Sequence, residues 1–173
     1  LENGYAALKP GAEREAGDYF SVTDWSRTRA YGLGINSLYL NLAGREPEGR
    51  VAAADRSALL DEIAARLEAT VDPLTGERPV HRACRPERIY RGAETARAPD
   101  LIIGYGPRHR ASWGTVLGRY SREVFLDNRD PWSGDHCMDA LFMSGCLFGN
   151  RRLPFKDPAL EDLAPAIVAH LTA

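Results

Sequence analysis

A compact apolar run, Leu101–Tyr105, sets the tightest limit on how this chain can fold. Five residues are too few for a core helix, and a nearly continuous apolar run is typical of a strand that is covered on both faces. Pro99 and Asp100 precede the run, and a loop beginning at Gly106 follows it. We therefore expect Leu101–Tyr105 to be a buried central strand.

A second pattern predicts an amphipathic helix that ends near Thr70. Between residues 59 and 67 the apolar side chains recur at helical spacing, and the charged side chains lie mostly on the opposite face. Asp55 or Ser57 can cap the start of this helix. The segment Asp72–Gly76 has the composition of a turn, which would end it.

Shorter segments complete the expected set of elements. The order of strands and helices predicts an α/β fold in one layered unit, with helices on the faces of one sheet and no linker that divides residues 1–173. The additional strands are expected at Ser37–Leu42, Arg88–Tyr90, Val124–Leu126 and Cys146–Phe148, and a last helix at Leu163–Leu171 with Asp162 as its cap.

Length and charge narrow the possible functions. The 173 residues suit one domain or a large part of one, and 22 basic against 24 acidic residues argue against a nucleic-acid polymer as partner. No apolar stretch reaches the length of a membrane span. The chain starts without Met or a signal peptide, so we expect it to be cut from a longer protein, and its localisation cannot be predicted. The three cysteines fit no disulfide framework or zinc motif.

The segment Trp132–Asp139 contains the residues best suited to metal chemistry. His136 follows Ser133, Gly134 and Asp135, a loop-like context in which an imidazole can reach a metal. Asp135 and Asp139 could orient that imidazole or line the rim of the site. The alternative is a capped turn with His136 on the surface, and spacing alone favours it. One His cannot form a metal site without ligands from elsewhere.

Two arginine pairs are candidates for anion binding. Arg27 and Arg29 lie within Asp24–Tyr31, and Arg108 and Arg110 directly follow the expected central strand. Guanidinium groups bind phosphate through paired hydrogen bonds. The alternatives, which the chemistry of the residues alone favours, are an Arg-rich surface turn anchored by Trp25 and Tyr31 for the first segment and a solvated basic loop for the second. The isolated His81 and His170 are predicted to be structural or surface residues.

Six segments together resemble one family. The chain is similar to bacterial type I phosphodiesterase / nucleotide pyrophosphatase proteins of the alkaline phosphatase superfamily. Asp24–Tyr31 resembles their signature DWSKTRAY, Asn41–Gly49 resembles NLKGREPEG, and Ala98–Tyr105 resembles APDLIVGY. Trp132–His136 matches WSGDH, Glu161–Pro165 resembles the start of EDIAPT, and Leu1–Tyr5 resembles LxxNGY. The matches occur in the family's order over nearly all of the chain. The chain departs from the family at three places. Arg27 occupies a position where the family usually has Lys, and Ser144–Cys146 replaces the family's PGV. His109 lies near a position where the family more commonly has Tyr.

This resemblance implies a fold and a function. It implies the C-terminal part of an α/β/α sandwich with a mostly parallel central sheet, and a site with two divalent metal ions, usually zinc. His136 corresponds to one metal ligand. The family's Thr or Ser nucleophile and its other ligands precede the NGY segment, so none of them lies in these 173 residues.

We therefore expect the chain to be the C-terminal fragment of a metal-dependent hydrolase of phosphate esters, inactive and without tightly bound metal on its own. Its partners would be the phosphate-ester substrate and the missing N-terminal part. The apolar surface against which that missing part would pack would be exposed, and this exposure would favour self-association. The alternative is a stand-alone, non-catalytic α/β module that binds an anionic ligand through Arg27, Arg29, Arg108 and Arg110.

Overall fold

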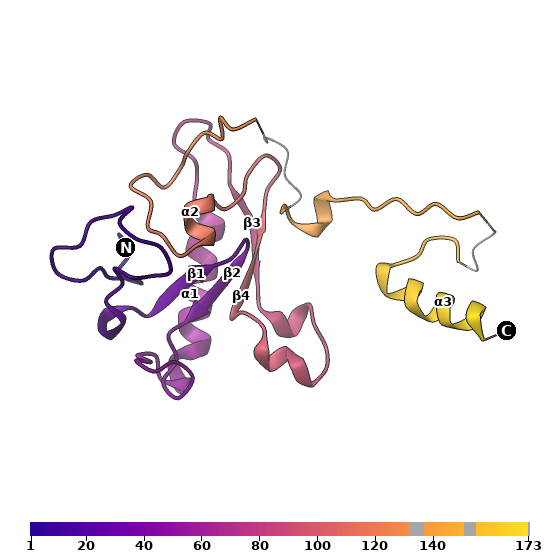
Figure 1. Cartoon of the computed structure of the whole chain (residues 1–173), viewed down its shortest axis with the longest axis horizontal. Coiled ribbons are helices and arrows are strands. Elements are labelled where there is room, and N and C mark those ends of the chain that lie inside the picture. Colours follow the sequence, from indigo (N-terminus) through magenta and orange to yellow (C-terminus); the bar gives the residue numbers. More distant parts are fainter. Residues whose placement is uncertain (132–136, 151–154, 173) are drawn as a thin grey trace. The chain divides into compact units, whose positions relative to one another are not determined.

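The computed structural model describes residues 1–131, 137–150 and 155–172. The chain divides into two units, Leu1–Met143 and Ser144–Ala173. The first unit contains a four-stranded sheet and one long helix (Figure 1). Its strands are β1 (Ala30–Leu33), β2 (Ser37–Leu40), β3 (Val80–Cys84) and β4 (Leu101–Tyr105), and its helices are α1 (Arg56–Ala69) and the short α2 (Trp113–Val116).

The sheet has the order β1-β2-β4-β3, and every neighbouring pair is antiparallel. The fold is thus mixed α/β, as predicted, but the predicted mostly parallel sheet is wrong for this part of the chain. α1 does connect two strands that run in the same direction, β2 and β3, as a crossover helix should. However, β4 returns through the segment 85–100 and inserts between them, so both of its neighbours run against it.

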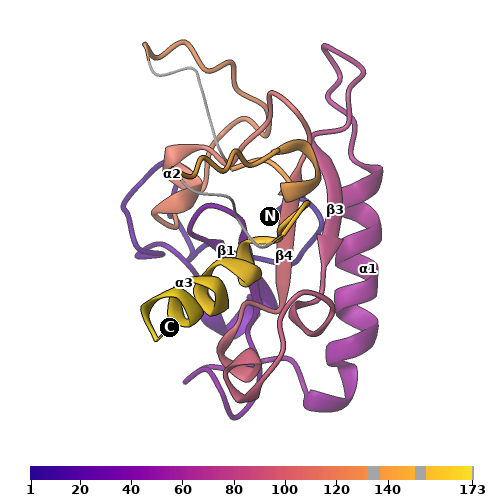
Figure 2. The same ribbon diagram turned by 90° about the vertical axis from the view of Figure 1, so that its right-hand side faces the viewer.

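One face of the sheet packs against α1 (Figure 2). Leu59, Leu60 and Ile63 of α1 are buried in one apolar cluster with core residues of all four strands. The strand residues of this cluster are Ala30, Leu40, Val80, Leu101 and Ile103. The predicted helix is confirmed within one residue at each end, and the predicted central position of Leu101–Tyr105 is confirmed because β4 has a neighbour on both sides.

Several expected strands are wrong. A 3₁₀ turn at Pro86–Arg88 overlaps the strand expected at Arg88–Tyr90. Val124–Leu126 and Cys146–Phe148 pair with no strand among the described residues, and their apolar side chains are largely exposed. Three apolar residues in a row create no buried face unless a sheet provides a partner, so composition alone misled here. Conversely, β1, β3 and α2 had not been predicted.

In the described part of the second unit, the helix α3 (Leu163–Leu171) follows a 3₁₀ turn at Leu160–Asp162. The helix is confirmed at both ends. The Asp162 side chain accepts a hydrogen bond from the backbone N–H of Ala159, and so it fastens the turn instead of capping α3. Among the described helices, none has the length and apolar character needed to cross a membrane.

Candidate functional site

The best candidate for a functional site lies where β4 ends. Met138 forms a parallel bridge with Tyr105, and the backbone N–H of Asp139 donates to the Tyr105 carbonyl at 2.8 Å. The segment 137–142 is therefore held at the carboxyl end of an inner strand. His136 and Asp135 lie outside the described residues, so their predicted roles remain predictions.

Asp139 is a buried anchor of this segment. Only 4% of the residue is exposed, and its carboxylate accepts hydrogen bonds from Nε and Nη2 of Arg82 and from the N–H of Leu141. Burial alone would raise the pKa of Asp139, but the bonds from Arg82 and Leu141 hold it below its usual value. Asp139 thus remains ionised at neutral pH and fastens the segment to β3.

A glycine makes room for this carboxylate. Gly104 pairs with Arg82 across β3 and β4, and a Cβ at Gly104 would lie 2.1 Å from Oδ2 of Asp139. No side chain other than hydrogen fits there without moving the carboxylate. The pattern of residues in the sequence pointed to Asp139 but not to Arg82 or Gly104. The one local signal was a glycine within an apolar strand, which often marks a close approach.

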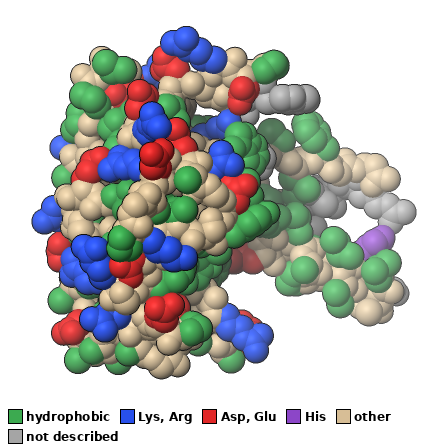
Figure 3. Space-filling view, turned by 60° about the vertical axis from the view of Figure 1, so that its left-hand side comes forward, with side chains coloured by type: hydrophobic (Ala, Val, Ile, Leu, Met, Phe, Trp, Pro, Cys, Tyr) green, Lys and Arg blue, Asp and Glu red, His purple; other side chains and the backbone are tan. Residues whose placement is uncertain are grey.

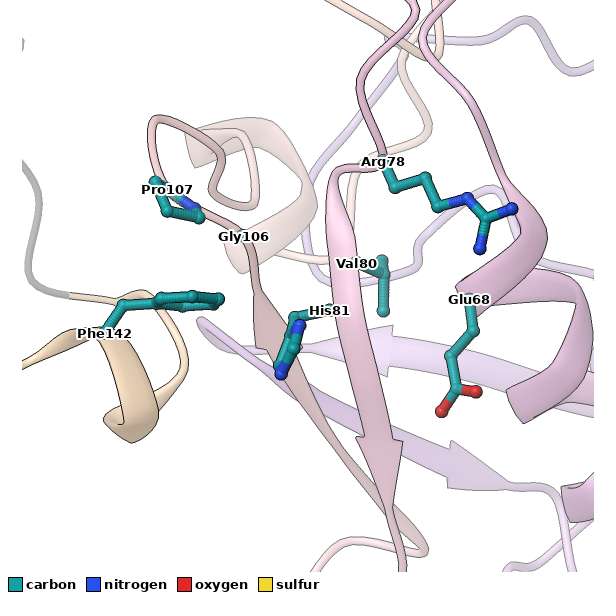
Figure 4. Close-up of a pocket in the computed structure, with 7 residues that line it drawn as sticks. All are labelled: Glu68, Arg78, Val80, His81, Gly106, Pro107 and Phe142. Carbon is teal, nitrogen blue, oxygen red and sulfur yellow. The ribbon is translucent and has the colours of Figure 1, made fainter.

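A cavity of about 290 Å³ lies beside these residues, at the outer edge of β3 (Figure 4). We call it the β3-edge cavity; it is lined by Glu68, Arg78, Val80, His81, Gly106, Pro107 and Phe142. β3 bulges at His81, because Val80 pairs with Tyr105 and Arg82 with Gly104, which leaves one extra residue on β3. His81 is exposed, as predicted for a surface residue, and it also lines this cavity, where its ring meets Phe142 edge-on at 4.8 Å.

Arg108 and Arg110 both have partners near this end of the sheet. Arg108, which has a left-handed backbone conformation, forms an ion pair with Glu77. The guanidinium of Arg110 lies over the ring of Trp113, 5.2 Å from its centroid. Both arginines therefore have contacts within the protein, while 77% of the Arg108 side chain stays exposed, as expected for a solvated basic loop.

Arg27 and Arg29 lie at the other end of the sheet. They precede β1, which runs in the same direction as β4 because each is antiparallel to β2. Arg108 and Arg110 follow β4, so a whole strand length separates the two pairs. Arg29 lies over the ring of Tyr5 at 5.3 Å. The structure does not bring the four arginines into one site.

The segment Asp24–Tyr31 is a turn whose side chains hold it together. The fully buried Thr28 donates through Oγ1 to the carbonyl of Asp24 at 2.8 Å and accepts from the N–H of Ala7 at 3.1 Å. Asn41 donates through Nδ2 to the carbonyls of Trp25 and Thr28. These contacts support the interpretation of this segment as a structural turn.

Aromatic rings extend from this turn over β1 and β2. Trp25 meets Tyr31 edge-on at 5.1 Å, and Tyr31 stacks on Tyr39 at 5.5 Å. Burial, together with the nearby carboxylate of Glu46, raises the pKa of Tyr31 to about 12. Tyr31 therefore stays protonated at neutral pH, and its hydroxyl donates to Glu46 Oε1 at 3.3 Å.

Metal ligands are sparse in the described part of the chain. Within residues 1–131, 137–150 and 155–172, no three His, Cys, Asp or Glu side chains come together in a way that could hold a metal ion. The described donors alone therefore do not fit a two-metal site.

Basic and acidic side chains are interspersed on the face of the molecule shown in Figure 3.

Comparisons of the chain with models of protein families, with curated proteins and with solved structures gave no match.

Proposed function

We propose that this chain is the C-terminal part of a metal-dependent hydrolase of phosphate esters, to which it contributes one metal ligand, His136, and part of the substrate-binding rim. One observation carries the proposal: six segments resemble type I phosphodiesterase signatures and occur in the same order along the chain. A single short match of this kind arises easily, whereas six matches in order are specific.

The position of Asp139 supports the proposal. His136 lies three residues before Asp139 in the sequence, and Asp139 is tied to Arg82 and to the end of β4. A metal ligand requires a well-positioned segment, and this ion pair fixes the chain close to that ligand. In this role Asp139 positions the segment that carries the ligand or lines the rim of the site.

The proposal requires residues from a longer protein. His136 would provide one ligand to one of two divalent metal ions, with zinc the expected metal. The nucleophile and the remaining ligands would come from sequence that precedes residue 1.

The alternative of an anion-binding module has no comparable support. It needs Arg27, Arg29, Arg108 and Arg110 around one ligand, whereas the two pairs lie at opposite ends of the sheet. Arg108 is moreover already paired with Glu77.

The test is hydrolysis of bis-p-nitrophenyl phosphate by the longer protein that includes this chain, with metal content measured in parallel. His136→Ala should lower kcat/KM by orders of magnitude and remove one metal ion, because a metal that binds a reacting oxygen contributes several kcal/mol to transition-state stabilisation. Asp135→Asn should cost about 10- to 100-fold if that carboxylate only orients the imidazole. The 173-residue chain alone should show no turnover with added zinc.

Two results would overturn the proposal. One is full activity and full metal content in His136→Ala, which would make His136 a surface residue. The other is metal-dependent turnover by the 173-residue chain that persists through repurification. A coding sequence upstream of residue 1 that lacks an Asp-His-Gly metal motif would also count against it.

A further inference from the structure

We propose that the β3-edge cavity binds a small zwitterion, an aromatic α-amino acid whose carboxylate pairs with Arg78 and whose ammonium group pairs with Glu68. This site is independent of the proposed hydrolase function. It rests on two opposite charges that line one cavity without neutralising each other, and on the aromatic and apolar side chains that line the cavity across β3 from them (Figure 4).

Arg78 is the available cation. Within the described part of the chain it forms neither a hydrogen bond nor an ion pair, whereas the neighbouring Arg82 and Arg108 pair with Asp139 and Glu77. Its guanidinium therefore keeps a planar set of donors for a ligand. A carboxylate is the group that matches this set with two parallel hydrogen bonds.

Glu68 is the anion, and its position is fixed. It lies in the last turn of α1, and its Oε1 accepts a hydrogen bond at 2.8 Å from the backbone N–H of Ala83 in β3. This bond leaves Oε2 for a ligand cation. Because Arg78 and Glu68 line the same cavity and form no ion pair with each other, a ligand with only one charge would leave the other group without a partner.

The rest of the lining suits an aromatic side chain. Figure 4 shows His81, Pro107 and Phe142 across β3 from Arg78 and Glu68. The edge-on packing of His81 on Phe142 leaves ring surface against which a further ring can pack.

The cavity wall is held by the backbone. Gly106 donates to the carbonyl of Pro79 at 2.9 Å, and a Cβ at Gly106 would lie 3.1 Å from the carbonyl oxygen of Arg78. A volume of about 290 Å³ lies at the lower limit of small-molecule pockets, which span about 300–1,000 Å³. This size admits one amino acid.

The test is titration of the 173-residue chain with L-phenylalanine, followed by chemical shifts in two-dimensional NMR. We expect a Kd of about 1 mM, the scale for a ligand of this size. Phenylacetate and phenethylamine carry one charge each and are the matched probes. Each should bind at least about 10-fold more weakly, since each lacks one charge-assisted contact.

Variants assign the contacts. Arg78→Gln should weaken binding of L-phenylalanine at least about 10-fold and leave phenethylamine unchanged. Glu68→Gln should weaken L-phenylalanine similarly and leave phenylacetate unchanged, while the amide oxygen still accepts the bond from Ala83. Arg97→Gln is the control, because Arg97 pairs with Glu94 in a 3₁₀ turn that does not line the cavity. It should bind like the wild type.

Three results would overturn the proposal. The first is no binding of L-phenylalanine by about 10 mM. The second is phenylacetate binding as tightly as L-phenylalanine, which would indicate a simple anion site. The third is unchanged binding in a folded Arg78→Gln protein. None of these results depends on phosphate-ester hydrolysis, so this site and the proposed function can fail separately.

Discussion

Replacing Gly104 with alanine should dislodge the carboxylate of Asp139, which lies directly against this position of β4. The added Cβ would lie 2.1 Å from Oδ2, 2.8 Å from Cγ and 3.0 Å from Cβ of Asp139. The side chain of Asp139 must therefore move. When it moves, it gives up its bonds from Arg82 and from the N–H of Leu141.

The expected cost follows from these bonds. A hydrogen bond to a charged group contributes about 1.5–3 kcal/mol net. The Arg82 side chain is 41% exposed and regains water when it is released, so its share falls toward the value of a surface pair, about 1 kcal/mol or less. Together with the bond from Leu141, we expect Gly104→Ala to lower the free energy of unfolding by about 2–3 kcal/mol.

A double-mutant cycle isolates this mechanism. Asp139→Ala should cost about the same as Gly104→Ala, because it removes the same bonds. In the double variant only the contact between the two Cβ atoms at 3.0 Å remains, and a shift of a few tenths of an ångström relieves it. The double variant should therefore be about as stable as Asp139→Ala alone, with a coupling energy of about 2 kcal/mol.

Urea unfolding followed by circular dichroism measures all four proteins. Gly32→Ala is the control, since a Cβ there meets its nearest neighbours at 3.8 and 4.0 Å, which is ordinary contact. It should change stability by no more than about 0.5 kcal/mol. Additive costs for Gly104→Ala and Asp139→Ala would refute the reasoning, because the two changes would then act on separate contacts.

Three other predictions concern buried polar groups. Burial alone would raise the pKa of Asp100, but hydrogen bonds from Arg45, Leu40 N–H and Arg56 lower it, and the pKa of Asp139 is lowered as well. Both carboxylates should therefore stabilise the fold at neutral pH, and this stabilisation should be lost as the pH falls from about 4 toward their lowered pKa values in the folded protein. A midpoint of urea unfolding that is equal at pH 7 and pH 3 would contradict this. Asp100→Ala should cost about 2–4 kcal/mol in urea unfolding, because it leaves the N–H of Leu40 unpaired next to two arginines, and a loss below about 1 kcal/mol would contradict it. Tyr31→Phe should remove a tyrosine that titrates near pH 12 from the ultraviolet absorbance titration, and an unchanged titration would show that another tyrosine is responsible.

Local patterns in the sequence were sufficient for α1, α3 and β4. Apolar spacing within a dozen residues decides whether a segment is helical, and a short apolar run bounded by turns predicts an inner strand. β3 escaped prediction because the sequence Val-His-Arg-Ala-Cys has no regular alternation. The structure explains this irregularity, since β3 is an edge strand with a bulge at His81.

Strand direction and the candidate site depended on tertiary structure. Whether β4 adds outside β3 or inserts between β2 and β3 is a choice among distant partners, which periodicity does not encode. The Arg82–Asp139 pair joins residues 57 positions apart, and the need for Gly104 arises only once that carboxylate lies over β4. In the same way, Glu68 and Arg78 line one cavity only because α1 packs against β3. Local spacing predicted α1, α3 and β4, but long-range packing decided which charges meet.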